Sequence, residues 1–211
     1  MKVIAHTGCM NTKMNSMESV LAGIREKADY IEVDVRFLEN RPVLTHDRPL
    51  EGEKYVPLEE AVLAVRDGGS CRLALDLKEW DRIGELAVLL KACGMEKRAV
   101  YLGNFMEDME KMTALGGGVP CFPNVYPEQV HGLDEKGLEV LAEKIRVLGV
   151  RTVGMNFKAV TPEVVKAFHQ QGISLSVWTV DEEEDIRRMA DIGADFITSD
   201  RPDRVKACRE T

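Results

Sequence analysis

The sequence has no long hydrophobic run and no concentration of positive charge. No apolar stretch approaches the roughly 18 residues that suggest a membrane-spanning helix, and the start, MKVIAHTGCM, lacks the long apolar segment of a signal peptide. The net charge is −8, and there is no Lys/Arg cluster, which argues against a nucleic-acid surface. We therefore expect a cytoplasmic protein with no nucleic-acid partner and no stable membrane insertion.

The cysteines lack the pairing that a disulfide framework or a structural zinc site would need. They are five in number, Cys9, Cys71, Cys93, Cys121 and Cys208. An odd number at scattered spacings, with no Cys-x-x-Cys pair, is typical of a reducing compartment. We interpret them as small core or surface residues, although Cys9 lies beside a candidate motif.

Short β-rich runs alternate with amphipathic helical stretches along the chain. The β-rich runs are residues 3–8, 30–35, 72–78, 98–103, 119–125, 152–157, 174–180 and 194–200. The helical stretches are residues 16–27, 57–69, 81–94, 105–118, 138–149, 161–172, 181–193 and 202–210. Together they make about eight βα units of roughly 26 residues each.

This alternation predicts a closed (β/α)₈ TIM-type barrel formed by one domain, residues 1–211. An open doubly wound sheet is the alternative, but no glycine-rich dinucleotide loop follows the first strand, and the number of units favours closure. Helix ends support the assignment. Gly94, Gly149, Gly172 and Gly193 fall where left-handed caps are wanted, and Thr161-Pro162 is typical of a helix start.

The stretch YIEVDVRFLENRPVLTHD, residues 30–47, begins as a strand that carries charges where apolar residues are expected. Strand side chains alternate between faces, so Glu32 and Asp34 share the barrel interior. The next strand, RLALDLK, places Asp76 and Lys78 together on one face. Active sites of such barrels lie at the C-terminal ends of the strands, where these side chains converge.

Three carboxylates in a small volume repel one another unless they are protonated or neutralised. An oxygen-ligated divalent cation such as Ca²⁺ or Mg²⁺ would neutralise them. The alternative is a structural salt-bridge layer in which the acids pair with Arg36, Arg72 or Lys78.

Two histidines are expected on the same rim. His6 ends the first strand, and a hairpin with its turn near residues 39–42 would bring His46 nearly opposite Asp34. Their ordinary pKa suits proton transfer at neutral pH, so one could act as a base and the other as an acid. The other histidines, His131 and His169, are interpreted as solvated surface residues.

Further polar and aromatic residues fall at the ends of later strands and are expected to line the substrate side. They are Asn104, Asn124, Asn156, Lys158 and Trp178. Trp178 shares a face with Ser176 and is placed inward, where its indole would pack against the carbon chain of an alcohol. Core filling is the alternative role for Trp178.

The ordered motifs AHTGCMNTKMNSMESV, YIEVDV, VLTHD, LALDLK, SVWTVD and ADFITSDRPD resemble the glycerophosphodiester phosphodiesterase family. The resemblance extends over the whole chain. It implies a (β/α)₈ barrel that binds one divalent cation, Ca²⁺ or Mg²⁺, and cleaves a phosphodiester with a histidine pair.

By position, the resemblance implies a set of metal ligands and a catalytic pair. The metal ligands would be Glu32, Asp34 and Asp76, and the catalytic pair His6 and His46. Substrate would contact Lys78, Thr7, Asn104, Asn156 and Trp178.

The chain departs from the family pattern in four places. Thr7 replaces an arginine and so removes a bidentate phosphate donor. Met14 replaces a glutamate, and Asp76 replaces the usual glutamate ligand. The subdomain that the family inserts after its His-Asp motif is nearly absent, so a different or more open substrate site is expected.

The expected function is metal-dependent hydrolysis of glycerophosphodiesters, or of a related small or lyso-lipid diester. The products would be an alcohol and a phosphomonoester such as glycerol 3-phosphate, which belongs to glycerol and lipid metabolism. Two alternatives stay open. One is a weak or inactive barrel that binds a phosphorylated ligand, and the other is an aldolase or isomerase that depends on Lys78.

Overall fold

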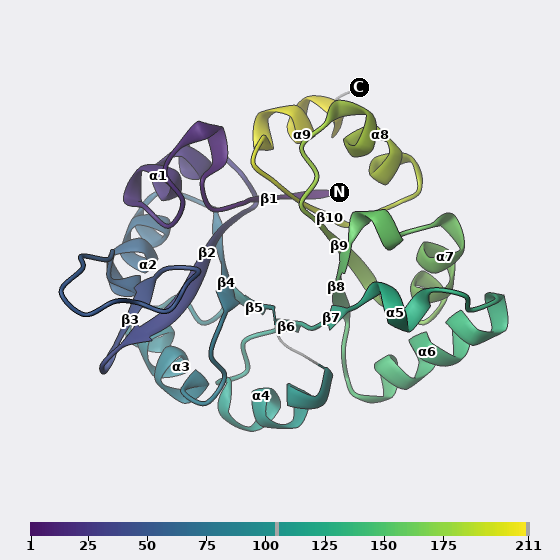
Figure 1. The fold of residues 1–211 in the computed structure, drawn as a ribbon, viewed down its shortest axis with the longest axis horizontal. Coiled ribbons are helices and arrows are strands. Elements are labelled where there is room, and N and C mark those ends of the chain that lie inside the picture. Colours follow the sequence, from purple (N-terminus) through teal and green to yellow (C-terminus); the bar gives the residue numbers. More distant parts are fainter. Residues whose placement is uncertain (104–105, 210–211) are drawn as a thin grey trace.

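The structure is a computed structural model, and it describes residues 1–103 and 106–209. The strands are β1 (Lys2–Ala5), β2 (Tyr30–Leu38), β3 (Arg41–Leu44), β4 (Arg72–Leu77), β5 (Ala99–Leu102), β6 (Cys121–Phe122), β7 (Asn124–Val125), β8 (Thr152–Asn156), β9 (Ser174–Trp178) and β10 (Phe196–Ser199). The strands other than β3 form an inner ring with the helices outside it, and β3 pairs with β2 outside the ring (Figure 1).

The helices that follow the strands cover the outer face of the ring (Figure 1). They are α1 (Met17–Arg25), α2 (Leu58–Asp67), α3 (Ile83–Ala92), α4 (Met109–Leu115), α5 (Pro127–Val130), α6 (Glu135–Val147), α7 (Pro162–Gln170), α8 (Glu183–Asp191) and α9 (Pro202–Arg209). Short 3₁₀ segments are η1 (Cys9–Asn11), η2 (Met106–Asp108) and η3 (Phe157–Ala159).

The sheet runs in the order β6-β5-β4-β2-β1-β10-β9-β8-β7, and its neighbours pair in parallel. Its two ends, β6 and β7, are consecutive in the chain and are separated only by Pro123. Proline has no backbone N–H to donate to a neighbouring strand, so the strand is interrupted at Pro123. The ring therefore closes through the chain itself, and the predicted single-domain barrel is confirmed.

Inside the ring, a small hydrophobic cluster lies below the C-terminal rim. It consists of Ile4, Tyr30, Ala74, Val100, Phe122 and Phe196. Glu32 lies two positions after Tyr30 and therefore on the same inner face. Asp76 likewise lies two positions after Ala74 and therefore on the inner face. Along these strands the inward positions thus change from apolar to acidic toward the rim, while Ile31, Val33 and Val35 belong to the outer core.

Most helix boundaries agree with the sequence pattern. The Thr161 hydroxyl caps α7 by accepting a hydrogen bond from Val164 N, and Pro162 takes the first helical position. The predicted left-handed glycines have φ between 67° and 93°. The helix α5 lies outside the predicted stretches, and α6 begins earlier than predicted because Asp134 caps it through Gly137 N.

The connection after the β2–β3 hairpin is short, as predicted. β3 ends at Leu44 and α2 begins at Leu58, with no helix or strand between them. Among the described residues, no helix combines the length and hydrophobicity needed to cross a bilayer.

Phe196→Ala should lower the free energy of unfolding by about 3–5 kcal/mol, because it leaves a cavity inside the ring. The Phe196 ring lies 5.2 Å from that of Phe122 and 5.9 Å from that of Tyr30, between centroids. Urea unfolding followed by circular dichroism measures the loss. Val88→Ala, at an α3 side chain with 69% exposure, is the control and should cost less than about 0.5 kcal/mol. Equal losses would contradict a stabilising role for the inner cluster.

Candidate active site

The structure brings the three predicted acids together at the C-terminal rim. Glu32 and Asp34 come from β2, and Asp76 comes from β4, where it pairs in register with Asp34. One carboxylate oxygen from each lies within 4.8 Å of the others. Glu32 is 4% exposed and Asp34 is 2% exposed, so water screens these charges poorly.

Backbone and amide groups from the segment after β1 hold two of the acids. Thr7 N donates to Glu32 Oε2 over 2.7 Å. Asn15 donates from Nδ2 to Asp34 Oδ2 over 2.8 Å and accepts from Asp34 N at its own Oδ1. Asn15 has a positive φ of 54°, a conformation that asparagine tolerates better than most residues. Asn15 is not among the site residues predicted from the sequence.

Lys78 is the cation that faces the acids directly. Its Nζ lies 2.7 Å from Asp76 Oδ2 and 3.0 Å from Asp34 Oδ1. Burial alone would lower the pKa of Lys78, but the charges and hydrogen bonds of Asp76 and Asp34 raise it above its ordinary value. The other two cations of the salt-bridge alternative lie elsewhere, since Arg36 pairs with Glu79 and Arg72 donates to Tyr30 and Lys97.

Glu32 receives no lysine or arginine partner among the described residues. Burial raises the pKa of Glu32 strongly, and the charges of Asp34 and Asp76 add to this effect against the opposing charge of His6. Burial likewise raises the pKa of Asp76, against the opposing charge of Lys78. A cluster of carboxylate oxygens that one lysine only partly compensates suits a hard divalent cation. The donor set therefore fits Ca²⁺ or Mg²⁺.

His6 stands between Glu32 and an aspartate that follows the last strand. Its Nδ1 lies 2.7 Å from Asp200 Oδ1, and its Nε2 lies 4.0 Å from Glu32 Oε2. Burial lowers the pKa of His6, but the hydrogen bond to Asp200 and the nearby carboxylates outweigh it and raise the pKa to about 9. Asp200 is itself anchored, because its backbone N donates to Asp181 Oδ1 over 2.7 Å.

Asp200 was missed as a site residue by sequence reasoning. The available signal was its position immediately after β10, in the motif ITSDRPD at the rim that carries the other polar groups. The contact itself joins residues 6 and 200, which are adjacent only because β1 pairs with β10.

The hairpin places His46 near the site, but its imidazole does not join the acids. The β2–β3 pairing is the predicted hairpin, and Thr45 N donates to Asp34 O. The His46 side chain is 60% exposed, and its Nδ1 lies 3.0 Å from Asp47 Oδ1. His46 does not line the rim cavity described next.

A cavity of about 330 Å³ opens at the rim above the inner cluster. One side is charged and carries His6, Glu32, Asp76 and Lys78. The other side is largely apolar and aromatic and carries Leu102, Phe122, Tyr126 and Trp178, with Asn124 among them. The inward placement of Trp178 is confirmed. We call this cavity the catalytic pocket.

The remaining predicted contacts are distributed differently. Thr7 is 1% exposed, and its hydroxyl binds Asn15 rather than opening onto the pocket. Asn156 lines a second cavity, where its Oδ1 accepts a hydrogen bond from Lys158 N. Asn104 lies outside the described residues.

A family model and a curated relative match this chain. A family model described as the glycerophosphoryl diester phosphodiesterase family matches residues 114–204. This segment contains Trp178 and Asp200. It does not contain Glu32, Asp34 or Asp76, which lie before it in the chain. A Mycobacterium tuberculosis protein named "Probable glycerophosphodiester phosphodiesterase 2" is 24% identical, and the match covers 96% of this chain and 88% of that protein.

Solved structures share the fold. A glycerophosphodiester phosphodiesterase from Parabacteroides distasonis is 23% identical with a TM-score of 0.78, covering 99% of this chain and 97% of that one. An Oleispira antarctica phosphodiesterase, solved with its product sn-glycerol-3-phosphate, is 16% identical with a TM-score of 0.80. The match covers 100% of this chain and 97% of that one.

Gly103→Ala should destabilise the protein and displace the Asp76 carboxylate. Gly103 has φ +79°, and a Cβ built there would lie 2.0 Å from Asp76 Oδ1. Gly52→Ala is the matched control, since Gly52 has φ +84° and a Cβ built there has no described atom within 4 Å apart from Gly52 itself and its chain neighbours. Both variants bear the backbone cost of about 1 kcal/mol, and only Gly103→Ala adds the clash. Equal unfolding free energies in urea would mean that Gly103 does not position Asp76.

Proposed function

We propose that the chain, part of which matches the glycerophosphoryl diester phosphodiesterase family model, hydrolyses glycerophosphodiesters or a related small or lyso-lipid diester. The products are an alcohol and a phosphomonoester such as glycerol 3-phosphate. The observation that carries this proposal is the convergence of three acids with Lys78 and His6 at the rim, where all of them except the buried Asp34 line the catalytic pocket. The product named in the Oleispira structure supports it.

Glu32, Asp34 and Asp76 would hold one divalent cation, Ca²⁺ or Mg²⁺, through their carboxylate oxygens. When bound, the cation supplies positive charge that offsets the negative oxygens of a phosphodiester. Thr7 N and Asn15 keep Glu32 and Asp34 oriented for this task.

The residues of the chain perform the remaining tasks. The Lys78 ammonium lies at the pocket wall, where it can bind a non-bridging phosphate oxygen. His6 turns Nδ1 toward Asp200, which leaves Nε2 free to give or accept a proton in the pocket. Trp178 packs against the carbon atoms of the alcohol.

His46 is proposed as the second member of the histidine pair. Its backbone is next to the acid-bearing strand, since Thr45 N bonds to Asp34 O. A role in proton transfer requires the imidazole to turn from Asp47 toward the pocket.

Five free cysteines support a reducing, cytoplasmic compartment.

The Lys78-dependent aldolase or isomerase is disfavoured by the same geometry. A Schiff base forms from a neutral amine, whereas two carboxylates hold Lys78 and raise its pKa. Binding without turnover stays the second candidate, because Thr7 supplies no phosphate donor and the His46 imidazole lies outside the pocket.

A substrate screen tests the proposed function. Glycerophosphocholine, glycerophosphoethanolamine, glycerophosphoglycerol, a lysophospholipid and bis-p-nitrophenyl phosphate are incubated with and without added Ca²⁺ or Mg²⁺. We expect glycerol 3-phosphate or another phosphomonoester to be released. If no diester is cleaved with either ion, the hydrolase proposal fails and the binding alternative is favoured.

Metal removal should abolish the activity, because the acids would lose the ion that offsets their charge. EDTA treatment is expected to stop turnover, and adding Ca²⁺ or Mg²⁺ is expected to restore it. Glu32→Gln keeps the shape of the side chain but removes a ligand charge, so the rise in melting temperature with added ion should shrink. Glu51→Gln, at an exposed loop position, is the control. Full activity in EDTA would contradict the proposed cation.

His6→Gln should reduce kcat by about 10² to 10⁴, the usual contribution of a proton-transfer group. Asp200→Asn should reduce it less, by about 10 to 10², as expected for a carboxylate that only orients a functional histidine. Asp185→Asn, at a partly exposed position on α8 where the side chain pairs with Arg188, should have no effect on kcat. Steady-state kinetics with the best substrate of the screen measures all three. An unchanged kcat in His6→Gln would remove His6 from the proposed mechanism.

A further inference from the structure

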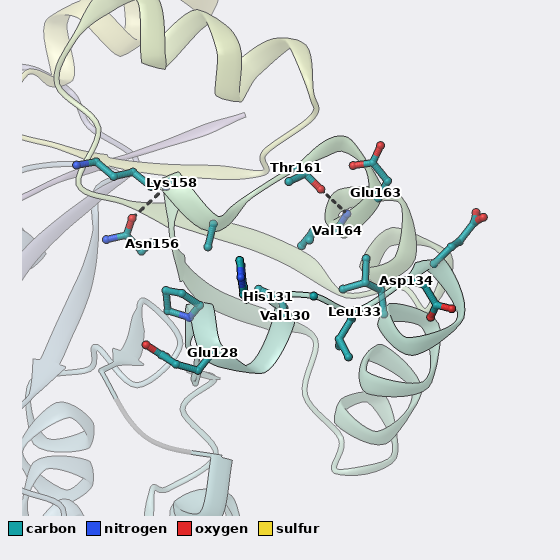
Figure 2. Close-up of a pocket in the computed structure, with 15 residues that line it drawn as sticks. Glu128, Val130, His131, Leu133, Asp134, Asn156, Lys158, Thr161, Glu163 and Val164 are labelled. Carbon is teal, nitrogen blue, oxygen red and sulfur yellow. Dashed lines mark hydrogen bonds between the residues drawn. The ribbon is translucent and has the colours of Figure 1, made fainter.

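A second and larger cavity lies beside the catalytic pocket on the same rim. Its volume is about 940 Å³, compared with about 330 Å³ for the pocket. One wall is α5 with residues 131–135, and the other is the segment from Asn156 to Val164 (Figure 2). The His131 side chain extends from the first wall into the groove in Figure 2. We call this cavity the rim groove.

Residues that line the rim groove are direct neighbours of residues that line the catalytic pocket, along the ends of β7 and β8. Tyr126 lines the pocket and the next residue, Pro127, lines the groove. Asn156 lines the groove and pairs in register with Trp178, which lines the pocket. Paired residues on neighbouring strands are about 5 Å apart, so one extended molecule can occupy both cavities.

The direction of such a molecule follows from the charges. The acids come from β2 and β4, on the opposite side of the ring from β7 and β8 (Figure 1). A phosphate held at Lys78 therefore has one esterified group directed across the pocket, past Tyr126 and Trp178. Beyond them, the rim groove is the next open space.

The groove combines apolar and charged lining. Leu133 presents the main exposed apolar surface, at 40% exposure, and the buried side chains of Val130, Leu138 and Val164 lie behind it. Charged and polar side chains also line the groove, namely Glu128, His131, Asp134, Glu135, Lys158 and Glu163. An apolar side chain exposed in a concave surface favours an apolar ligand. The catalytic pocket is at the small end of the range for ligand sites, so only a long substituent would extend into the groove.

We propose that the rim groove holds a hydrocarbon chain carried by one of the two groups esterified to the phosphate. This inference rests on the proposed function and specifies its substrate class, which is a diester with an unbranched apolar substituent of several carbons. The groove then acts as a specificity site, and a diester with a short substituent is bound by the catalytic pocket alone.

A series of glycerophospho-n-alkyl esters tests this inference. The ethyl, butyl, hexyl and octyl esters are compared below their micelle concentrations with the ion that supports activity. Once the chain reaches the groove, kcat/KM should rise about threefold to fourfold per added methylene, the factor expected for burying one such group. The rise should appear mainly as a lower KM.

Leu133→Asn separates binding in the groove from a general effect, because it keeps a similar size but removes the apolar surface. It should flatten the chain-length dependence and leave the ethyl ester unchanged. Leu148→Asn is the matched control, since Leu148 is 51% exposed and does not line the groove. It should keep the steep dependence, and the melting temperatures of both variants should stay near that of the parent protein.

The outcomes separate the two proposals. Turnover of every ester with no dependence on chain length, or with the same dependence in Leu133→Asn, overturns the groove assignment and leaves the hydrolase proposal intact. A preference for glycerophosphocholine over all alkyl esters would assign a cationic headgroup in place of a hydrocarbon chain and would also overturn it. Failure to cleave any ester with Ca²⁺ or Mg²⁺ overturns the proposed function and this inference with it.

Discussion

The mutual repulsion of Glu32, Asp34 and Asp76 is the constraint on which the rest of this barrel mouth depends. Their oxygens are close together and poorly solvated, so the surrounding groups must compensate the charge. Lys78 does so for two of the acids, and the Thr7 N–H supports the third. This compensation is incomplete, which is the physical basis for proposing that a divalent cation belongs there.

The order of strands divides the mouth into two chemically different halves. Consecutive βα units place β1, β2 and β4 together, and these strands deliver His6 and the acids. The strands β7, β8 and β9 complete the opposite side with Asn124, Trp178 and the nearby Tyr126. A phosphodiester is divided in the same way, because its phosphate is charged and its organic substituent is largely carbon. Under the proposed function, the arrangement would orient a diester as well as bind it.

The predicted acid cluster depended only on local rules, and the structure brings it together. Period-two alternation sets the face of Glu32 and Asp34, and parallel pairing brings Asp76 beside Asp34. Side-chain direction beyond a strand end follows no such rule. The hairpin of His46 has the predicted pairing, yet its imidazole contacts Asp47. Such a side chain takes the direction that its nearest partners allow.

The sequence by itself determined the barrel, the outward apolar faces and the inward acids, because alternation and helix capping act over a few residues. Only the tertiary structure decided the partners of those acids and of His6. The contact between His6 and Asp200 joins opposite ends of the chain, and it exists because β1 pairs with β10 when the ring closes. The rim groove likewise forms only where α5 meets the segment after β8. Contacts between distant segments depend on how the whole chain closes on itself, which no local pattern encodes.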